Sequence, residues 1–362
     1  MECPTCPDTS FGEWGETLIA QLGGRRYPLT VTFEVTERCN LDCVHCFINQ
    51  PASCRQCNCD ELSLDEIKRI FDQMAAAGVL NLLLTGGEVF IRPDFLDIYR
   101  YAKQLGMLVM VFTNGTLINE GIADFLAEWP PYFIEISTYG HTRKTYEYIT
   151  QVPGSFDRYR RGIQLLHDRG LNLGLKTIVM TVNRDELDQM RTFAEELDIP
   201  FRYDGMIWPR MDGDQAPLKY RLSAAEVVAL DREDLLRREN FVKMHSDQKS
   251  LYPRSEMVYS CGAGYYGFHL DASGQMSMCM MARQPAFDLR QGNLEQGWDF
   301  LRTIRERKRI MDTPCRTCKA GVLCTQCPGW SQIVHGDDET PVEFVCEMGH
   351  LRLDYILSIQ DQ

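Results

Sequence analysis

Short apolar runs and amphipathic stretches alternate along most of the chain. The apolar runs are rich in β-branched and aliphatic residues, which is typical of buried strands. They occupy residues 31–36, 80–85, 108–112, 133–137, 173–180 and 201–206. The stretches between them carry apolar residues at helical spacing, which predicts helices. These helices are expected near residues 64–77, 93–104, 118–128, 156–169 and 185–197.

The first of these helices has well-marked boundaries. Ser63 can cap its N-terminus, and Glu66, three residues later, can reach back to form a capping box. Gly78 is the residue type that commonly ends a helix. The predicted buried face consists of Ile67, Ile70, Phe71 and Met74.

The alternation of strand and helix predicts an α/β fold. Parallel strands need crossover helices, and right-handed crossovers curl the sheet toward a barrel. The unit repeats about six times, which is fewer than the eight units of a closed barrel. We therefore expect a partial (β/α)6 TIM-like barrel. In such folds the chemistry lies at the carboxyl ends of the strands.

The chain changes texture after the last predicted strand. Residues 212–253 are polar and charged, with a helix expected at 224–240, and Gly, Cys and Met become frequent from residue 261. We expect helices at 298–309 and 351–359, in a small domain that metal binding holds together. The predicted division is an N-terminal extension at 1–25, the barrel at 26–211, a bridging region at 212–255 and the cysteine-rich domain at 256–362.

Composition and charge exclude several classes of partner. The 362 residues are 44% hydrophobic and 25% charged, which suits a globular chain with a sizeable core. The formal net charge of −13 opposes binding to nucleic acid. No apolar run has the length of a membrane span, and the N-terminus lacks the pattern of a signal peptide. We expect a cytoplasmic protein that binds neither nucleic acid nor membrane.

Cysteine is the most informative residue type in the chain. Fifteen cysteines in a cytoplasmic protein favour metal sites over disulfides. Cys39, Cys43 and Cys46 follow the first strand with the spacing CxxxCxxC. Three thiolates can hold three irons of a [4Fe–4S] cube and leave the fourth iron open, whereas an electron carrier uses four cysteines. Taken alone, the triplet would also suit a zinc loop or buried free cysteines.

The triplet, followed one strand later by Gly86-Gly87-Glu88, resembles the radical S-adenosylmethionine (SAM) superfamily. The resemblance implies that the three cysteines hold a [4Fe–4S] cluster and that SAM binds its open iron. It also implies the reaction, in which reductive cleavage of SAM yields a 5′-deoxyadenosyl radical that abstracts hydrogen from a substrate. The aromatic residue usual before the third cysteine is replaced by His45, with Phe47 after Cys46.

The same resemblance assigns SAM contacts at the ends of the predicted strands. Many relatives also have an arginine beyond the serine of the fourth strand, where this chain reads Tyr148-Ile149-Thr150-Gln151. Lys176 on the fifth strand is therefore the candidate partner of the SAM carboxylate. The complete set is Gly86, Gly87, Glu88, Thr113, Asn114, Ser137 and Lys176.

Seven further cysteines lie in the C-terminal region and resemble a SPASM domain, the auxiliary-cluster module of some radical SAM enzymes. The resemblance implies two auxiliary iron–sulfur clusters. One would be held by Cys315, Cys318, Cys324 and Cys346, and the other by Cys261, Cys279 and Cys327. No cysteine stands just before Cys261, so the second cluster has an open iron, a non-cysteine ligand or a [2Fe–2S] form. On spacing alone, a pair of zinc sites is the alternative.

Five cysteines stay outside these sets. Cys3 and Cys6 have the spacing CxxC, and Cys54, Cys57 and Cys59 have the spacing CxxCxC. Such spacing could hold a further metal, and free thiols on loops explain it equally well.

The resemblance leads to a functional hypothesis with two alternatives. The leading one is an enzyme that oxidatively modifies a peptide or protein substrate, as the maturases of ribosomally made peptides do. The alternatives are a haem-precursor decarboxylase of the same family and a non-catalytic iron–sulfur electron carrier. The expected partners are a flavodoxin- or ferredoxin-like electron donor and, because the first strand begins near residue 30, a separate peptide-recognition protein or direct peptide binding.

Overall fold

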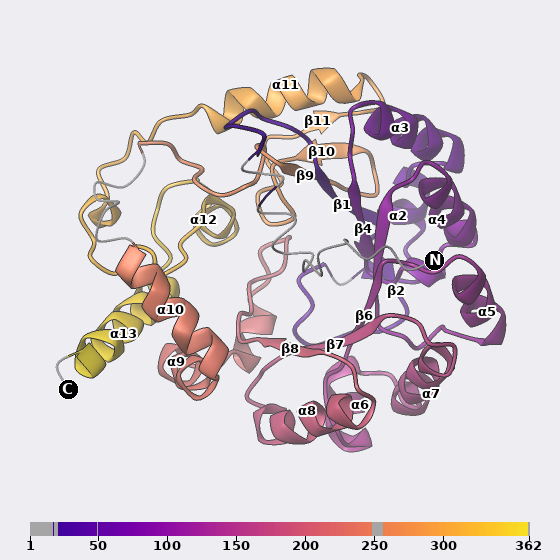
Figure 1. Cartoon of the computed structure of the whole chain (residues 1–362), viewed down its shortest axis with the longest axis horizontal. Helices are drawn as coiled ribbons and strands as arrows, with labels where there is room; N and C mark the ends of the chain where they lie inside the picture. Colours follow the sequence, from indigo (N-terminus) through magenta and orange to yellow (C-terminus); the bar gives the residue numbers. More distant parts are fainter. Residues whose placement is uncertain (1–16, 18–20, 49, 248–255, 361–362) are drawn as a thin grey trace, which may run out of the picture.

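The computed structural model describes residues 17, 21–48, 50–247 and 256–360, and its main feature is a curved parallel sheet ringed by helices (Figure 1). Six parallel strands form the sheet in chain order. They are β1 (Thr30–Thr36), β4 (Asn81–Gly86), β5 (Leu108–Thr113), β6 (Phe133–Ser137), β7 (Leu173–Ile178) and β8 (Phe201–Asp204). Each of these six strands begins and ends within two residues of its predicted bounds, because alternation and β-branching are local signals.

Five crossover helices cover the outer face of this sheet (Figure 1). They are α3 (Leu64–Ala76), α4 (Phe95–Gln104), α5 (Glu120–Glu128), α7 (Ser155–His167) and α8 (Leu187–Glu196). Helix α3 has the predicted capping box, with the backbone N–H of Ser63 donating to Glu66 Oε2 at 2.7 Å. The whole predicted apolar face of α3 is buried. The partial (β/α)6 TIM-like barrel is therefore confirmed.

Several short elements were not expected from the sequence. Helix α6 (Arg143–Thr150) precedes α7, and its N-terminus is capped by Thr142. The others are β2 (Arg38–Cys39), β3 (Gln50–Pro51), α2 (Arg55–Asp60), α12 (Pro328–His335) and the 3-10 turns Val89–Ile91, Arg184–Glu186, Ala216–Tyr220 and Pro314–Arg316. All of them are shorter than three turns of helix or a typical strand, so their periodicity is too brief to be recognised.

The cysteine-rich region continues the barrel sheet beyond β1. Strand β9 (Gly267–Leu270) pairs parallel with β1, and β10 (Gln275–Ser277) and β11 (Phe287–Asp288) follow in antiparallel order. Gly267 permits the close approach, since a Cβ there would lie 2.3 Å from Thr30 Oγ1. A single hydrophobic core extends from Val31 on β1 to Ile304 on α11 (Leu294–Arg305).

Helices of the bridging region pack against the C-terminal helix. The helix expected at 224–240 is divided at Asp234 into α9 (Ala224–Glu233) and α10 (Leu235–Asp247). The last helix, α13 (Glu343–Gln360), is longer than the predicted 351–359, and α11 begins and ends four residues earlier than predicted. Arg352 of α13 donates to Asp231 Oδ2 of α9 at 2.6 and 2.9 Å. Within the described residues, no helix combines the length and the apolar character needed to cross a bilayer.

Candidate active site

The loop that follows β1 carries the cysteine triplet at the carboxyl end of the barrel. Its backbone is held by the end of α6, because the N–H groups of Asp42 and Val44 donate to Thr150 and Ile149 at 3.0 and 2.9 Å. The N–H of Cys46 donates to the carbonyl of Cys43 at 3.0 Å, which closes a tight turn between the two thiols. The short helix that the sequence analysis missed therefore positions the triplet.

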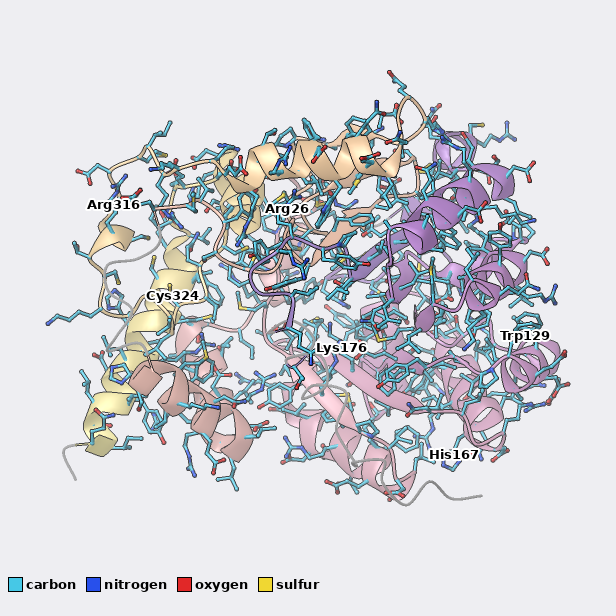
Figure 2. All side chains as sticks on the ribbon, turned by 45° about the horizontal axis from the view of Figure 1, so that its top comes forward. Arg26, Trp129, His167, Lys176, Arg316 and Cys324 are labelled. Carbon is cyan, nitrogen blue, oxygen red and sulfur yellow. A yellow bond between two sulfur atoms is a disulfide. The ribbon has the colours of Figure 1, made fainter. Side chains whose placement is uncertain are left out.

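The triplet opens into a cavity of about 420 Å³ at the strand ends. Every strand from β4 to β7 contributes a predicted SAM contact to its wall. The predicted contacts that line it are Gly86, Gly87, Thr113, Asn114, Ser137 and Lys176, together with Cys39, Cys43 and Cys46. Figure 2 shows Lys176 near the middle of the molecule, where the strand ends converge. Predicted site residues as far apart in sequence as Cys39 and Lys176 thus share one cavity.

Glu88 is the one predicted SAM contact that does not line this cavity. Its side chain is fully buried and accepts hydrogen bonds from Thr113 Oγ1 at 2.8 Å and from the N–H groups of Asn114 and Phe90 at 2.7 and 3.2 Å. Burial raises the pKa of Glu88 to about 7, although these three donors oppose the shift. Glu88 therefore joins the turn after β4 to the turn after β5.

The two glycines before Glu88 permit a contact between two protein segments. A Cβ on Gly86, whose φ is +137°, would lie 2.0 Å from the carbonyl oxygen of Thr36. A Cβ on Gly87 would lie 2.3 Å from the carbonyl oxygen of Arg38. This use of the glycines was not expected from the sequence. Their lack of side chains lets the start of the cysteine loop pack directly onto the end of β4.

Two thiols of the triplet, those of Cys39 and Cys43, have raised pKa values. Burial raises the pKa of Cys39 to about 12 and that of Cys43 well above its ordinary value, and the neighbouring thiols of the triplet add to both shifts. Metal binding at this loop must therefore release protons. Asn114 Nδ2 lies 3.8 Å from Cys39 Sγ, close enough to donate to it.

The donor set fits a cluster with one open corner. Cys39, Cys43 and Cys46 are the cysteines of the described chain that line the cavity. Among the described residues, no three His, Cys, Asp or Glu side chains converge on a single metal ion. A cluster makes a different demand, because each cysteine binds its own iron.

The polar end of the cavity lies around β6, β7 and β8. Burial, helped by the nearby charge of Arg202, lowers the pKa of Lys176, and Glu135 and Asp204 partly oppose this shift. Arg202 Nη2 donates to Glu135 Oε1 at 2.7 Å, so that carboxylate already has a cationic partner. Lys176 thus places an amino group in the cavity wall.

The opposite wall is apolar and was not anticipated from the sequence. Met280 and Met281 follow Cys279, and Trp330 follows Cys327, so the C-terminal region closes the cavity. Trp330 stacks on Trp208, with ring centroids 4.6 Å apart. The available signal was the position of Trp208, four residues after β8.

The C-terminal cysteines gather in the two groups that the SPASM resemblance implies. Burial raises the pKa of Cys346 to about 11, and the neighbouring thiols of Cys315, Cys324 and Cys318 add to the shift. Burial raises the pKa of Cys327 to about 12, with contributions from two more thiols, those of Cys279 and Cys261.

Cys324 lies beside α13 (Figure 2). A Cβ on Gly349 of that helix would be 2.3 Å from Cys324 Cβ, so the glycine permits the approach of the cysteine loop. In the stretch just before Cys261, residues 254 and 255 lie outside the described residues, and Glu256 accepts a hydrogen bond from Lys308 Nζ at 3.0 Å.

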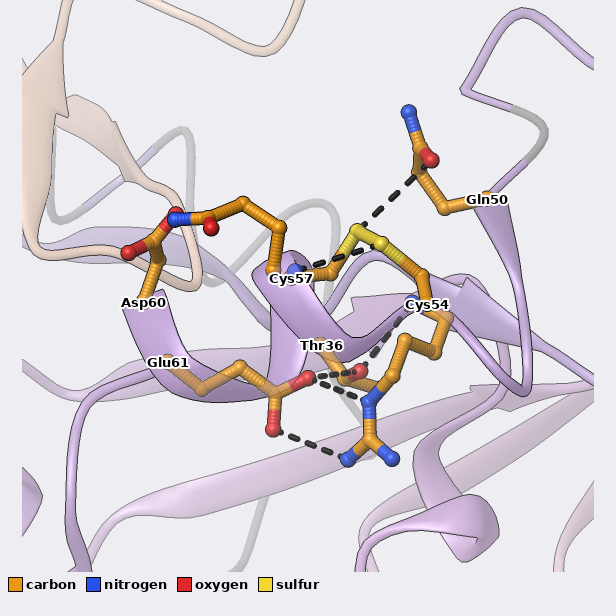
Figure 3. Close-up of a disulfide and its surroundings, with 8 residues drawn as sticks. Thr36, Gln50, Cys54, Cys57, Asp60 and Glu61 are labelled. Carbon is orange, nitrogen blue, oxygen red and sulfur yellow. Dashed lines mark hydrogen bonds and ion pairs between the residues drawn. A yellow bond between two sulfur atoms is a disulfide. The ribbon is translucent and has the colours of Figure 1, made fainter.

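The CxxCxC group contains a disulfide instead of a metal site. Cys54 and Cys57 are bonded to each other, with Cα atoms 5.5 Å apart (Figure 3). Cys59 is an exposed free thiol. The expectation that the cysteines would form no disulfide is therefore wrong for this pair. Cys3 and Cys6 lie outside the described residues.

A second, more polar cavity of about 290 Å³ adjoins the first, and both are lined by Glu37 and Ile48. Its walls include Asp271 and Arg283. Arg283 is tied to the fully buried Glu34, with Nη2 2.7 Å from Glu34 Oε1. Both cavities are lined by residues of the barrel and of the C-terminal region.

Comparison with known proteins finds a matching family model, similar relatives and a shared fold. The model of the radical SAM superfamily matches residues 33–197. The AdoMet-dependent heme synthase of Methanosarcina barkeri is 32% identical over 52% of this chain and 53% of its own length. The subtilosin biosynthesis protein AlbA of Bacillus subtilis is 26% identical over 70% of this chain and 55% of its own length. The chain thus spans about half the length of these relatives.

A solved structure shares the fold over most of the chain. SuiB of Streptococcus suis bound to the precursor peptide SuiA superposes with a TM-score of 0.63, covering 88% of this chain and 77% of SuiB. The sequence identity is 17%, so this likeness concerns the fold alone.

Proposed function

Because residues 33–197 of this chain form a radical SAM domain, we propose that the protein is a radical SAM enzyme that oxidatively modifies a peptide or protein. The observation that carries the proposal is the shared cavity of about 420 Å³, in which three thiols and polar groups from successive strand ends meet. An electron carrier has no need of such a cavity. The cavity therefore favours an enzyme over a non-catalytic electron carrier.

Each proposed role follows from the chemistry of the side chain. Cys39, Cys43 and Cys46 hold three irons of a [4Fe–4S] cluster and leave one iron for SAM. Lys176 pairs with the SAM carboxylate, and polar groups at the strand ends orient the rest of the molecule. When bound, the cluster and SAM supply one-electron chemistry that removes a hydrogen atom from an unactivated carbon. The apolar wall of Met280, Met281 and Trp330 keeps water from that carbon.

The two C-terminal cysteine sets are proposed to hold auxiliary iron–sulfur clusters. Both sets bring thiols together, and burial raises the pKa of Cys346 in one set and of Cys327 in the other. The loss of protons on metal binding makes assembly at these sets pH-dependent.

The shape of the site favours a peptide over a haem precursor. A cavity of about 420 Å³ lies at the lower end of the range for ligand sites, and SAM must share it. We propose that one substrate side chain enters the space that SAM leaves, and that the adjoining polar cavity of about 290 Å³ holds the residues next to it. A rigid macrocycle would have to fit entirely inside. The similarity to AlbA and the fold of SuiB support this choice, and the similarity to a heme synthase supports the alternative.

SAM cleavage tests the enzymatic proposal. Protein reconstituted anaerobically with iron and sulfide, then reduced with dithionite, is expected to release 5′-deoxyadenosine from SAM. Cys39→Ser should abolish the release, because it removes a cluster ligand, and Cys59→Ser is the matched control that should retain it. Absence of deoxyadenosine from well-reconstituted protein under every reductant would refute the proposal.

The substrate is tested by comparing two additions. Short peptides encoded beside the gene are expected to raise deoxyadenosine release and to lose hydrogen mass, whereas iron coproporphyrin should do neither. The opposite result would establish the haem-precursor reading. A flavodoxin- or ferredoxin-like electron donor and, for some peptides, a separate recognition protein are proposed partners. The cytoplasm is the proposed compartment, since it keeps cluster thiols reduced.

A further inference from the structure

The disulfide between Cys54 and Cys57 lies in a segment that contacts the start of the cysteine loop at both of its ends. We call residues 50–61 the strap. The strap consists of β3, a tight turn and the short helix α2 (Figure 3), and its β3 pairs with Arg38 and Cys39. None of the residues of α2 is buried, so its own side chains supply little packing energy. A helix of six residues is also too short to be stable alone.

The first end of the strap pairs with the cluster loop through the backbone. Strand β3 runs parallel to β2, with Gln50 opposite Arg38 and Pro51 opposite Cys39. The N–H of Cys54 donates to the carbonyl of Pro51 at 2.9 Å. The disulfide therefore begins one turn away from the residue that pairs with Cys39.

The second end of the strap returns to the same place through side chains. Glu61 accepts two hydrogen bonds from Arg38, at 2.8 Å from Nε and 3.0 Å from Nη2. The side chains of this ion pair are 11% and 6% exposed, so it is shielded from solvent. Thr36 Oγ1 donates to the same carboxylate. Both ends of the strap thus hold the backbone that precedes Cys39.

The disulfide is placed for reversible opening. Cys54 and Cys57 are half-buried, and the residues between and after them are exposed, so a reductant can reach the sulfurs. The N–H of Cys57 donates to Cys54 Sγ at 3.2 Å and would stabilise a thiolate there. Cys57 Sγ lies 3.6 Å from Gln50 Oε1, an acceptor for the thiol once it carries a proton. The reduced pair therefore has partners ready.

We propose that Cys54 and Cys57 form a redox-active site for thiol–disulfide exchange, and that its opening loosens the strap against Arg38 and Cys39. The reductant is a dithiol. Its thiolate attacks one sulfur of the pair, the other sulfur leaves as a thiolate, and the second thiol of the reductant then closes its own disulfide. Two electrons and two protons pass to the protein, which gains two thiols. Cys59 is not part of the pair, because it lies two residues after Cys57 on α2 and therefore about 200° around the helix axis from it.

Differential alkylation in glutathione redox buffers tests the exchange. Under anaerobic conditions, peptide mapping is expected to show Cys54 and Cys57 changing together from a disulfide to two labelled thiols, in a single two-electron step. Dithiothreitol should reverse the oxidation fully. Labelling of the two cysteines at different potentials, pairing with other cysteines, or zinc held by Cys54, Cys57 and Cys59 would each overturn the proposal.

Hydrogen exchange tests the coupling to the cluster loop. Reduction is expected to raise amide exchange about threefold or more in residues 36–40 and 50–61. A Cys54→Ser, Cys57→Ser double variant should behave as the reduced form in every buffer, and Cys59→Ser should behave as the unaltered protein. Equal exchange at residues 36–40 in both states would refute the coupling. Neither readout needs SAM or its cleavage, so failure here is distinct from failure of the proposed function.

Discussion

Glu88 shows how one buried carboxylate can serve a site without facing it. Motif resemblance assigns it to SAM, but the side chain points into the protein and joins Thr113 to Asn114. The adjoining Gly86 and Gly87 face the cavity, yet their missing side chains make room for Thr36 and Arg38. At the scale of residues, the motif is thus a joint between two strand ends and the cluster loop. Whether these residues also bind SAM remains a prediction.

The raised pKa of Glu88 predicts a pH-dependent stability. Between its ordinary pKa of 4.5 and about 7, the folded state binds more protons than the unfolded state. The contribution of this group to stability is therefore greatest below pH 4.5 and is lost as the pH rises to about 7. Relative to Glu88→Gln, the unaltered protein should lose about 1–3 kcal/mol between pH 5 and pH 8. Urea unfolding at several pH values measures this, and parallel pH profiles would contradict it.

Gly87→Ala should be destabilising and should disturb the cluster loop. The new methyl group would lie 2.3 Å from Arg38 O and 2.5 Å from Glu37 O, so the backbone has to move. We expect a loss of about 1–3 kcal/mol in unfolding free energy and less iron after reconstitution. Gly121→Ala is the control, since its Cβ would meet only Asn119 Oδ1 at 3.5 Å. Equal behaviour of the two variants would show that the close approach is unimportant.

At the scale of elements, one short helix and one long helix each hold a cysteine loop in place. Helix α6 fixes the backbone of the cysteine loop through Asp42 and Val44. Helix α13 is fixed to α9 by Arg352, which also donates to the carbonyl of Leu323 at 2.8 Å, next to Cys324. The proposed auxiliary-cluster loop is therefore braced by an ion pair between the bridging region and the C-terminal helix.

Arg352→Met should destabilise this junction strongly. Its side chain and that of Asp231 are 8% and 3% exposed, so removal of the cation leaves a buried carboxylate with Arg237 alone. We expect a loss of about 3–5 kcal/mol in unfolding free energy. Arg100→Met is the control, because the Arg100–Asp97 pair is 40% and 58% exposed and should contribute about 0–1 kcal/mol. A similar loss in both variants would argue against a special role for the buried pair.

At the scale of the whole molecule, the cysteine-rich region and the barrel form one body. Strand β9 extends the sheet at β1, a shared core joins them, and residues of both close the cavity. The triplet and the two C-terminal cysteine sets nevertheless remain separate. The pKa values of Cys39, Cys327 and Cys346 are each raised by neighbouring thiols of their own set. The domain boundaries proposed from composition stay a prediction.

Removing one cysteine set should leave the other two loaded. Two double variants, Cys39→Ser with Cys43→Ser and Cys315→Ser with Cys318→Ser, should each lower the iron content by about four atoms per chain. The double variant Cys279→Ser with Cys327→Ser should remove about four irons per chain, or about two if that cluster is of the [2Fe–2S] type. Iron analysis with Mössbauer spectra measures each loss. Unchanged iron in any of these variants would exclude that set as a cluster site.

Sequence by itself determined the order of the six barrel strands and the helices between them, because their periods are local and each segment is long enough to be read. The family resemblance of the sequence also predicted three cysteine sets, whose role as cluster ligands stays a prediction. Only tertiary structure decided that Glu88 turns inward, that β9 joins β1, that Trp208 stacks on Trp330 and that Cys54 bonds Cys57. These depend on which distant segments meet, and on the space left between them, so no local pattern contains them.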